Sequence, residues 1–271
     1  MDYLIQAEEV LANRKNYVVI DCRKKEEYEH SHVEDAIWLP IDHWLKENNA
    51  EGIARGENVI SLFHFISLMS RLGISNDTKV VLYDDNQGRA SARFWFVAKH
   101  YGHKHVYVLN GGWKGCSNLP ISTTLTQQIP FSYYEPTQTD GYIVSLVDLL
   151  KDYDNLKIID VRTDDEWTGK DLHGNPRGGH LFGSVHLNYE DLVSKDTSNT
   201  FVNTDEIVSK LESRGIKKGD KIVTYCQAGV RASIVGLALK VAGFTNVALY
   251  DGSMYQWSRC FALRLESEYL H

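Results

Sequence analysis

The sequence predicts an α/β protein built from two similar domains, each a mostly parallel sheet with helices on both faces. Two observations lead to this prediction. Short runs rich in β-branched residues alternate with helical patterns along the chain, which is typical of parallel sheets covered by helices. Segments of the first half also recur in the second half in the same order, as expected for a repeated domain.

Four pairs of matching segments define the repeat. The pairs are 18–23 with 157–162, 32–37 with 180–185, 80–91 with 222–233, and 109–113 with 250–254. A polar stretch at 118–141 lies between the halves; it is rich in Thr and Gln and carries three prolines, which is typical of a linker. We therefore expect domains at 1–117 and 142–271, joined by a linker at 118–141.

The chemistry of the second half depends on Cys226. The apolar run at 222–225 predicts a short buried strand, and apolar residues recur at helical spacing from Arg231 until Gly243. The thiol therefore lies where a strand ends and a tight loop turns into a helix. Inward-pointing loop amides and the positive end of the helix dipole stabilise an anion there. We expect Cys226 to ionise readily and act as a nucleophile, although most cysteines are simply small buried side chains.

The repeat differs at the residue that would carry this chemistry. When Tyr83 is aligned on Tyr225, Asp84 falls on Cys226. An aspartate can neither carry sulfur nor attack it. We therefore expect the first domain to be catalytically silent.

The size of the loop favours sulfur chemistry over phosphate chemistry. Four residues separate Cys226 from Arg231, and phosphatases of the Cys-loop type use one residue more to hold a tetrahedral phosphate. A shorter loop closes more tightly and suits a persulfide, whose outer sulfur would accept the backbone N–H bonds. The expected active-site loop consists of Gln227, Ala228, Gly229, Val230 and Arg231.

Composition excludes several other classes of function. A net charge of -7 gives no general attraction to nucleic acid or anionic membranes. The N-terminus lacks the features of a secretory signal, and no apolar run is long enough for a membrane span, so we expect a cytoplasmic protein. The four cysteines are scattered, with no Cys-x-x-Cys pair, which argues against a zinc site and leaves no metal expected.

Several motifs together resemble a known family. They are the Cys-x4-Arg loop, the Asp-x-Arg that follows the first strand of each half, the segment 179–185 and the segment 250–257. The chain resembles the tandem-domain rhodaneses, which are thiosulfate or 3-mercaptopyruvate sulfurtransferases, over nearly its whole length and in the same order. The resemblance implies two similar α/β domains, the active cysteine in the second, and neither a metal nor an organic cofactor.

The resemblance also implies a reaction. The Cys226 thiolate would take sulfur from thiosulfate or 3-mercaptopyruvate, store it as a persulfide, and pass it to cyanide or a thiol. The expected partners are thus a small-molecule donor and acceptor, with no nucleic acid and no membrane. Two alternatives stay open: a non-catalytic sulfur-relay or interaction module, and a Cys-loop phosphatase or arsenate reductase.

Four further residues are candidates for supporting roles. We expect Asp160 and Arg162 to brace the loop structurally. Arg177, on a loop with flanking glycines, is a candidate for binding an anionic substrate because its guanidinium fits a sulfonate or carboxylate. His32 is a candidate because a first-half histidine lies close to the site in the mercaptopyruvate enzymes that the chain resembles.

The chain departs from the family at two places. Gln227-Ala228 follows the cysteine where vertebrate thiosulfate enzymes have basic residues and mercaptopyruvate enzymes have Gly-Ser. Glu166 stands where animal members carry a substrate-binding arginine. Both changes weaken the charge complementarity for a dianion such as thiosulfate and leave the identity of the donor open.

Overall fold

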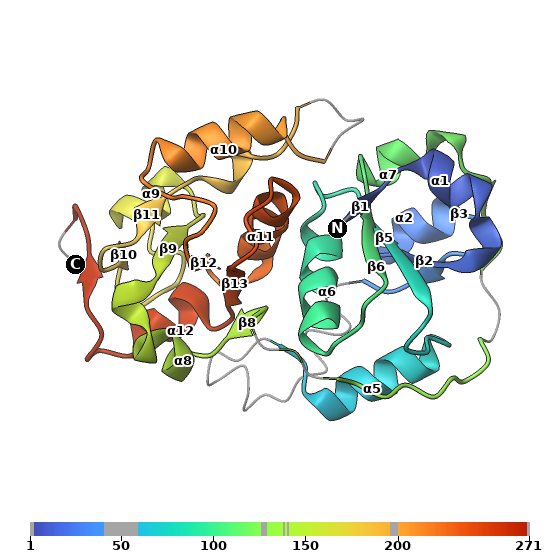
Figure 1. Cartoon of the computed structure of the whole chain (residues 1–271), viewed down its shortest axis with the longest axis horizontal. Helices are drawn as coiled ribbons and strands as arrows, with labels where there is room; N and C mark the ends of the chain where they lie inside the picture. The colour runs from blue at the N-terminus through green and yellow to red at the C-terminus, as the bar shows by residue number, and fades with distance from the viewer. Residues whose placement is uncertain are drawn as a thin grey trace. The chain divides into compact units, whose positions relative to one another are not determined.

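The computed structural model describes residues 3–40, 59–125, 129–137, 139, 141–195 and 200–269. These residues form two compact units, each with its own sheet (Figure 1). Unit 1 holds the described residues up to 139 and a short segment that includes Thr200; unit 2 holds residues 141–193 and those from Phe201 on. Thr200 donates its N–H to Asn110 Oδ1 (2.9 Å) and accepts the Gly111 N–H (3.0 Å) within unit 1.

Unit 1 is built on a five-stranded sheet in the order β1-β6-β5-β2-β4, in which every neighbouring pair is parallel. The strands are β1 (Leu4–Ile5), β2 (Tyr17–Asp21), β4 (Ile37–Trp38), β5 (Lys79–Tyr83) and β6 (Val106–Leu109). The helices are α1 (Ala7–Ala12), α2 (Lys25–His30), α5 (Leu62–Arg71), α6 (Arg89–His100) and α7 (Gly112–Gly115).

Unit 1 also contains a small antiparallel pair of strands, and one of the two comes from the predicted linker. Strand β3 (His32–Val33) pairs with β7 (Ile121–Ser122), and Tyr134 is buried against Phe65. The structure therefore places part of the stretch 118–141 within unit 1, because its apolar side chains pack there despite the polar composition around them.

Unit 2 repeats the sheet of unit 1 strand for strand, in the order β11-β9-β12-β13-β8 with all neighbours parallel. The strands are β8 (Ile143–Val144), β9 (Lys157–Asp160), β11 (Val185–His186), β12 (Ile222–Tyr225) and β13 (Val247–Tyr250), with β10 (His180–Leu181) and β14 (Leu265–Glu266) as the antiparallel pair. The helices are α8 (Leu146–Lys151), α9 (Asp164–Thr168), α10 (Thr204–Glu212), α11 (Val230–Val241) and α12 (Ser253–Arg259).

The central strand β12 shows that helices cover both faces of this sheet. Its residues Val223 and Tyr225 belong to a buried cluster with Leu149 of α8 and Trp257 of α12. On the opposite face, Thr224 donates a hydrogen bond to the carbonyl of Ala232 in α11 (3.1 Å). Alternate side chains of a strand point to opposite faces, so both faces of β12 are packed. The predicted fold class is confirmed.

Candidate active site

Cys226 directly follows β12, as the sequence predicts, and α11 begins at Val230, one residue before the predicted start. Gly229 directly precedes α11 and lies in the left-handed region at φ 83, a conformation that a residue without Cβ adopts at little cost. The carbonyl of Gly229 accepts two hydrogen bonds from Ser233, one from its N–H and one from its hydroxyl. Cys226 itself is only 1% exposed, so bulk water is largely excluded from its thiol.

The first turn of α12 fixes the backbone of the Cys226 loop. The Cys226 N–H donates to Ser253 Oγ (3.3 Å), and the Cys226 carbonyl accepts the Met254 N–H (3.0 Å). The carbonyl of Gln227 accepts the Tyr255 N–H (3.0 Å). These bonds hold the main chain of the first two loop residues.

The matching loop of unit 1 shows what such a loop binds. Asp84 is 2% exposed, and its Oδ1 accepts the N–H groups of Asn86 and Gly88, both at 2.8 Å. Its Oδ2 accepts the Ser91 N–H at 2.9 Å. Three backbone donors therefore converge on one buried anion, as in an anion-binding nest.

A two-point ion pair joins the end of the Cys226 loop to α9. Arg231 Nη1 lies 2.5 Å from Glu166 Oε2, and Nη2 lies 2.8 Å from Oε1. Burial alone would raise the pKa of Glu166, but the hydrogen bonds and charge of Arg231 lower it to about 2. Burial alone would lower the pKa of Arg231, but the hydrogen bonds to Glu166 raise it, and so does the electrostatic interaction with the neighbouring Cys226. Arg231 therefore braces the loop through a carboxylate.

Sequence reasoning did not identify Glu166 as this partner. One signal was available: the pattern Thr163-x-x-Glu166 is a capping box, and the structure contains it. The Glu166 N–H donates to Thr163 Oγ1, and Glu166 Oε2 accepts the Thr163 N–H at 3.2 Å. The box fixes the start of α9 and with it the direction of the Glu166 carboxylate.

Gln227 is held by a reciprocal pair of amide hydrogen bonds with Asn175. The Asn175 amide donates to Gln227 Oε1 (2.9 Å), and the Gln227 amide donates to Asn175 Oδ1 (3.0 Å). Asn175 is 5% exposed and also accepts the Ser258 hydroxyl at 3.3 Å. No sequence pattern predicts this pairing.

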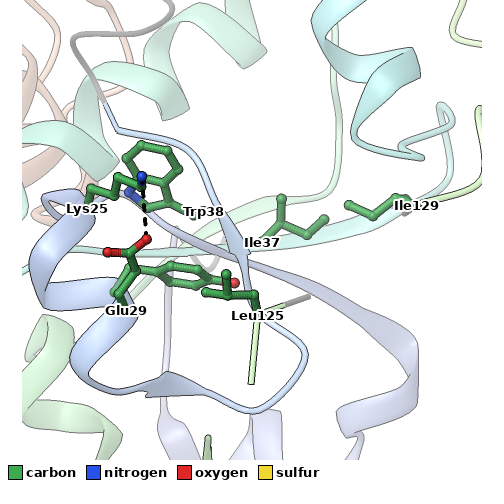
Figure 2. Close-up of a pocket in the computed structure, with 7 residues that line it drawn as sticks. Lys25, Glu29, Ile37, Trp38, Leu125 and Ile129 are labelled. Atoms are coloured by element: carbon green, nitrogen blue, oxygen red, sulfur yellow. Dashed lines mark ion pairs between the residues drawn. The ribbon is translucent and has the colours of Figure 1, made fainter. Parts of the chain in front are cut away.

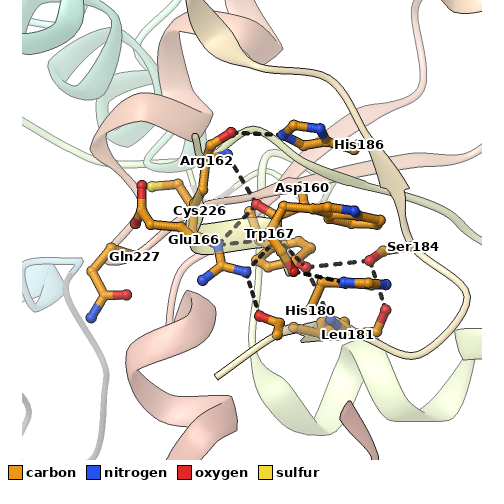
Figure 3. Close-up of polar contacts among 12 residues, drawn as sticks. Asp160, Arg162, Glu166, Trp167, His180, Leu181, Ser184, His186, Cys226 and Gln227 are labelled. Atoms are coloured by element: carbon orange, nitrogen blue, oxygen red, sulfur yellow. Dashed lines mark hydrogen bonds and ion pairs between the residues drawn. The ribbon is translucent and has the colours of Figure 1, made fainter. Parts of the chain in front are cut away.

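Asp160 and Arg162 form a buried brace beside the loop (Figure 3). Arg162 contacts the Asp160 carboxylate through its N–H, Nε and Nη2 at 2.6–3.0 Å and also donates to the carbonyl of Gly179 (2.7 Å). The Tyr225 hydroxyl donates to Asp160 Oδ2 (2.6 Å) and accepts the Leu181 N–H (3.0 Å). This arrangement ties β9, β10 and β12 together directly before Cys226.

Unit 1 contains the same brace in the same positions. Arg23 contacts Asp21 through its N–H, Nε and Nη2, and Tyr83 donates to Asp21 Oδ2 at 2.5 Å. The Val33 N–H donates to the Tyr83 hydroxyl at 3.2 Å. Because unit 1 lacks the thiol, this duplication indicates that the brace serves the fold and positions the loop.

Arg177 is engaged by the C-terminal segment of unit 2. Its guanidinium donates to the carbonyls of Ser258, Leu263, Trp257 and Cys260 at 2.8–2.9 Å. Four of its five N–H donors are thereby used. These contacts describe a brace, and the binding of a substrate anion by Arg177 stays a prediction.

His32 lies fully buried in unit 1. Its ring stacks on Tyr28, and its Nδ1 and Nε2 lie 2.7 Å and 3.1 Å from the carbonyls of Tyr28 and Thr124. In unit 2 the matching His180 stacks on Trp167 and bonds to its carbonyl in the same way, and burial lowers the pKa of His180. A role for His32 toward the substrate stays a prediction.

Unit 1 also contains a pocket of about 260 Å³ (Figure 2). Its lining combines one exposed ion pair, Lys25 with Glu29 at 3.4 Å, with aromatic and aliphatic side chains.

The described residues contain no group of three or more His, Cys, Asp or Glu side chains that could hold a metal ion. Within the same residues, no helix is long and apolar enough to cross a bilayer. The buried thiol at the end of β12, directly before the loop that leads into α11, makes the Cys226 loop the candidate active site.

The fold and the site define a protein with two copies of one α/β domain, of which the second presents a cysteine loop. The rhodanese-like domain matches residues 6–119 and again residues 144–260. The chain therefore belongs to the rhodanese family and contains its domain twice, which confirms the resemblance seen in the sequence.

Named relatives cover most of the chain. The sulfur carrier protein TtuD of Thermus thermophilus is 35% identical over 215 residues, which are 73% of this chain and 74% of that protein. A thiosulfate sulfurtransferase of Corynebacterium glutamicum is 29% identical over 257 residues, 86% and 83% of the two chains. The structure of SseA from Escherichia coli, a 3-mercaptopyruvate sulfurtransferase, has the same fold, with a TM-score of 0.80 at 22% identity over 93% of this chain and 99% of its own.

Proposed function

We propose that the protein is a sulfurtransferase that moves sulfur from a donor to an acceptor through a persulfide on Cys226. The observation that carries this proposal is the Asp84 carboxylate, held by three backbone amides in the matching loop of unit 1. The outer sulfur of a Cys226 persulfide is two bonds from Cβ, as a carboxylate oxygen of Asp84 is. In the sequence alignment, Ala228 and Val230 stand opposite Asn86 and Gly88, and the left-handed glycine that precedes the helix is Gly88 in unit 1 and Gly229 in unit 2.

The reaction has two half-reactions and a covalent intermediate. In the first, the Cys226 thiolate attacks the donor sulfur, and sulfite leaves from thiosulfate or pyruvate from 3-mercaptopyruvate. In the second, cyanide or a small thiol attacks the outer sulfur and restores the thiolate. The loop amides and the start of α11 stabilise the negative charge on the outer sulfur. Asp84 cannot perform these steps, so unit 1 is catalytically silent.

A sulfur relay is the second candidate function. A relative that is 35% identical is named a sulfur carrier protein, and a relay needs the same persulfide as an enzyme does. In that case Cys226 would take its sulfur from a partner protein and not from a small donor. A Cys-loop phosphatase is less well supported, because the loop has one residue fewer than a phosphate cradle.

The deciding experiment is mass spectrometry of the protein after exposure to thiosulfate or 3-mercaptopyruvate, together with the release of sulfite or pyruvate. We expect a gain of one sulfur atom on Cys226, lost again on addition of cyanide. Cys226→Ser should abolish both signals, whereas Cys260→Ser, a control at a partly exposed cysteine, should retain them. Turnover by Cys226→Ser at the parent rate would refute the proposal. Loading only from a protein persulfide would favour the relay.

The domain limits and location follow from the same reasoning. The proposed start of the second domain at residue 142 is supported by the start of unit 2 at Gly141, whereas unit 1 extends beyond the proposed limit at residue 117. All four cysteines are free thiols, which suits the reducing cytoplasm that we propose as the location.

A further inference from the structure

Arg231 is the cation of the Cys226 loop, and the Glu166 carboxylate compensates its positive charge. Both terminal nitrogens of its guanidinium lie within 2.5–2.8 Å of the Glu166 carboxylate. The side chains of Arg231 and Glu166 are 15% and 2% exposed, so water screens the pair only weakly. Two opposite unit charges this close together produce electric fields that largely cancel each other at a third group nearby.

Glu166 is fixed in this position and in this charge state. Its Oε2 also accepts the N–H and the hydroxyl of Thr163, at 3.2 Å and 3.1 Å. Because its pKa is lowered to about 2, it stays ionised at any physiological pH. Arg231 therefore stays neutralised while a donor binds.

Gln227, the first residue after the cysteine, is paired with an uncharged side chain. Gln227 is occupied by the amide of Asn175. Two other cations of unit 2 are also engaged: Arg177 donates to backbone carbonyls of the C-terminal segment, and Arg259 donates to the Tyr255 carbonyl (2.8 Å) and to Asn175 Oδ1 (3.4 Å). Both belong to elements outside the loop.

The burial of Cys226 makes donor charge costly. With the residue at 1% exposure, a donor must lose much of its hydration before it reaches the thiol. The cost of removing an ion from water rises steeply with its charge and is recovered only where a counter-charge is present. A dianion at this loop would lack the free guanidinium that Arg231 would otherwise supply.

We propose that Glu166 makes this site selective for singly charged sulfur donors, in which the transferred sulfur is bonded to an organic group, over the dianion thiosulfate. This rests on the proposed sulfurtransferase function. The step balances without a redox partner. The bond between Cys226 Sγ and the donor sulfur forms as the bond from that sulfur to its leaving group breaks, and the leaving group takes the electron pair.

Two donors of similar size test the selectivity. Thiosulfate carries two negative charges, and methanethiosulfonate carries one because a methyl group replaces an oxygen; their leaving groups are sulfite and methanesulfinate. We would measure kcat/KM for persulfide formation on Cys226 with each donor, in the native protein, in Glu166→Gln and in Asp165→Asn. Asp165 is the matched control, since it lies on the same helix but is 57% exposed in a pair with Lys170.

We expect Glu166→Gln to raise the ratio of thiosulfate to methanethiosulfonate rates about tenfold, because one charge on Arg231 is released toward the donor. Asp165→Asn should leave the ratio within about twofold, because an exposed charge is screened. An unchanged ratio in a Glu166→Gln protein that still loads from methanethiosulfonate would overturn the proposal, since a purely structural role moves stability and not donor preference.

A measurement on the native protein covers the case in which Glu166→Gln does not fold. Attraction of an anion to a positive site weakens as salt rises. We therefore expect the thiosulfate rate to stay flat or to increase between low and physiological salt; a steep fall would show a free cation and overturn the proposal. Failure of native Cys226 to load from thiosulfate, from methanethiosulfonate and from 3-mercaptopyruvate alike would refute the sulfurtransferase function itself and the selectivity with it.

Discussion

Asp84 in unit 1 and Cys226 in unit 2 occupy the same place in two copies of one loop. Each directly follows a central strand of its sheet. The carbonyl of Asp84 accepts the Trp113 N–H at 2.8 Å, and the carbonyl of Cys226 accepts the Met254 N–H at 3.0 Å. This backbone anchor is shared, while the left-handed glycine before the helix is Gly88 in unit 1 and Gly229 in unit 2. From the shared anchor we infer that the Asp84 carboxylate indicates where the second loop can hold an anion.

Cys226→Asp should place a carboxylate in that anion site. We expect this variant to lack sulfur transfer. Its free energy of unfolding should be about 1–2 kcal/mol higher than that of Cys226→Ser, because charge-assisted bonds from backbone amides are among the stronger hydrogen bonds. Denaturant titration of the two variants at neutral pH measures the difference. Serine is the matched control, since it is small and polar but uncharged. An aspartate variant less stable than the serine variant would show that the loop amides do not converge on this site.

Asp84→Asn should lower the stability of unit 1 and leave sulfur transfer at Cys226 intact. Loss of the charge weakens the three N–H bonds that converge on the carboxylate, so we expect the free energy of unfolding to fall by about 2 kcal/mol. Persulfide formation on Cys226 should continue, measured by mass in buffer without denaturant. Asp85→Asn, one residue on and exposed, is the control and should change stability by less than about 0.5 kcal/mol.

The parts of this protein that follow from local sequence were predictable. The strand before Cys226 and the helix after it appear as an apolar run and as helical spacing, because each depends on residues within a few positions. The repeat made the sheet architecture predictable as well, since two copies of one pattern support the same assignment.

Contacts between distant segments were not predictable in this way. Glu166 and Arg231 are 65 positions apart, and Asn175 and Gln227 are 52 apart. Neither pair has a signature in local composition, because each depends on how α9 and the segment around Asn175 pack against the loop. The four carbonyl partners of Arg177 depend likewise on the path of the C-terminal segment.

Arg177→Lys distinguishes a brace from a substrate-binding residue. A lysine cannot reach four carbonyls that a planar guanidinium spans, so we expect the free energy of unfolding to fall by about 2–4 kcal/mol. The KM for the donor should change by less than about twofold. Arg214→Lys is the control, because that exposed arginine donates to only two carbonyls. A large rise in KM with unchanged stability would instead support the substrate-binding role predicted from the sequence.

The ion pair of Glu166 with Arg231 should give a distinct pH dependence of stability. The pKa of Glu166 is about 2 in the folded protein and 4.5 for the free side chain. A folded pKa below the unfolded one stabilises the protein above pH 4.5, and this contribution is lost as the pH falls toward about 2. From the size of the shift, the contribution near neutral pH is about 3 kcal/mol.

We therefore expect Glu166→Gln to be less stable than the native protein at pH 6 and the gap to narrow as the pH approaches 2. Subtracting the two curves removes the contributions of the other carboxylates, which both proteins share. Denaturant titrations across this range measure the gap, with Asp165→Asn as the control that should follow the native curve. A gap that stays constant with pH would mean that the Glu166 side chain stabilises the protein through packing, and that its charge does not hold Arg231.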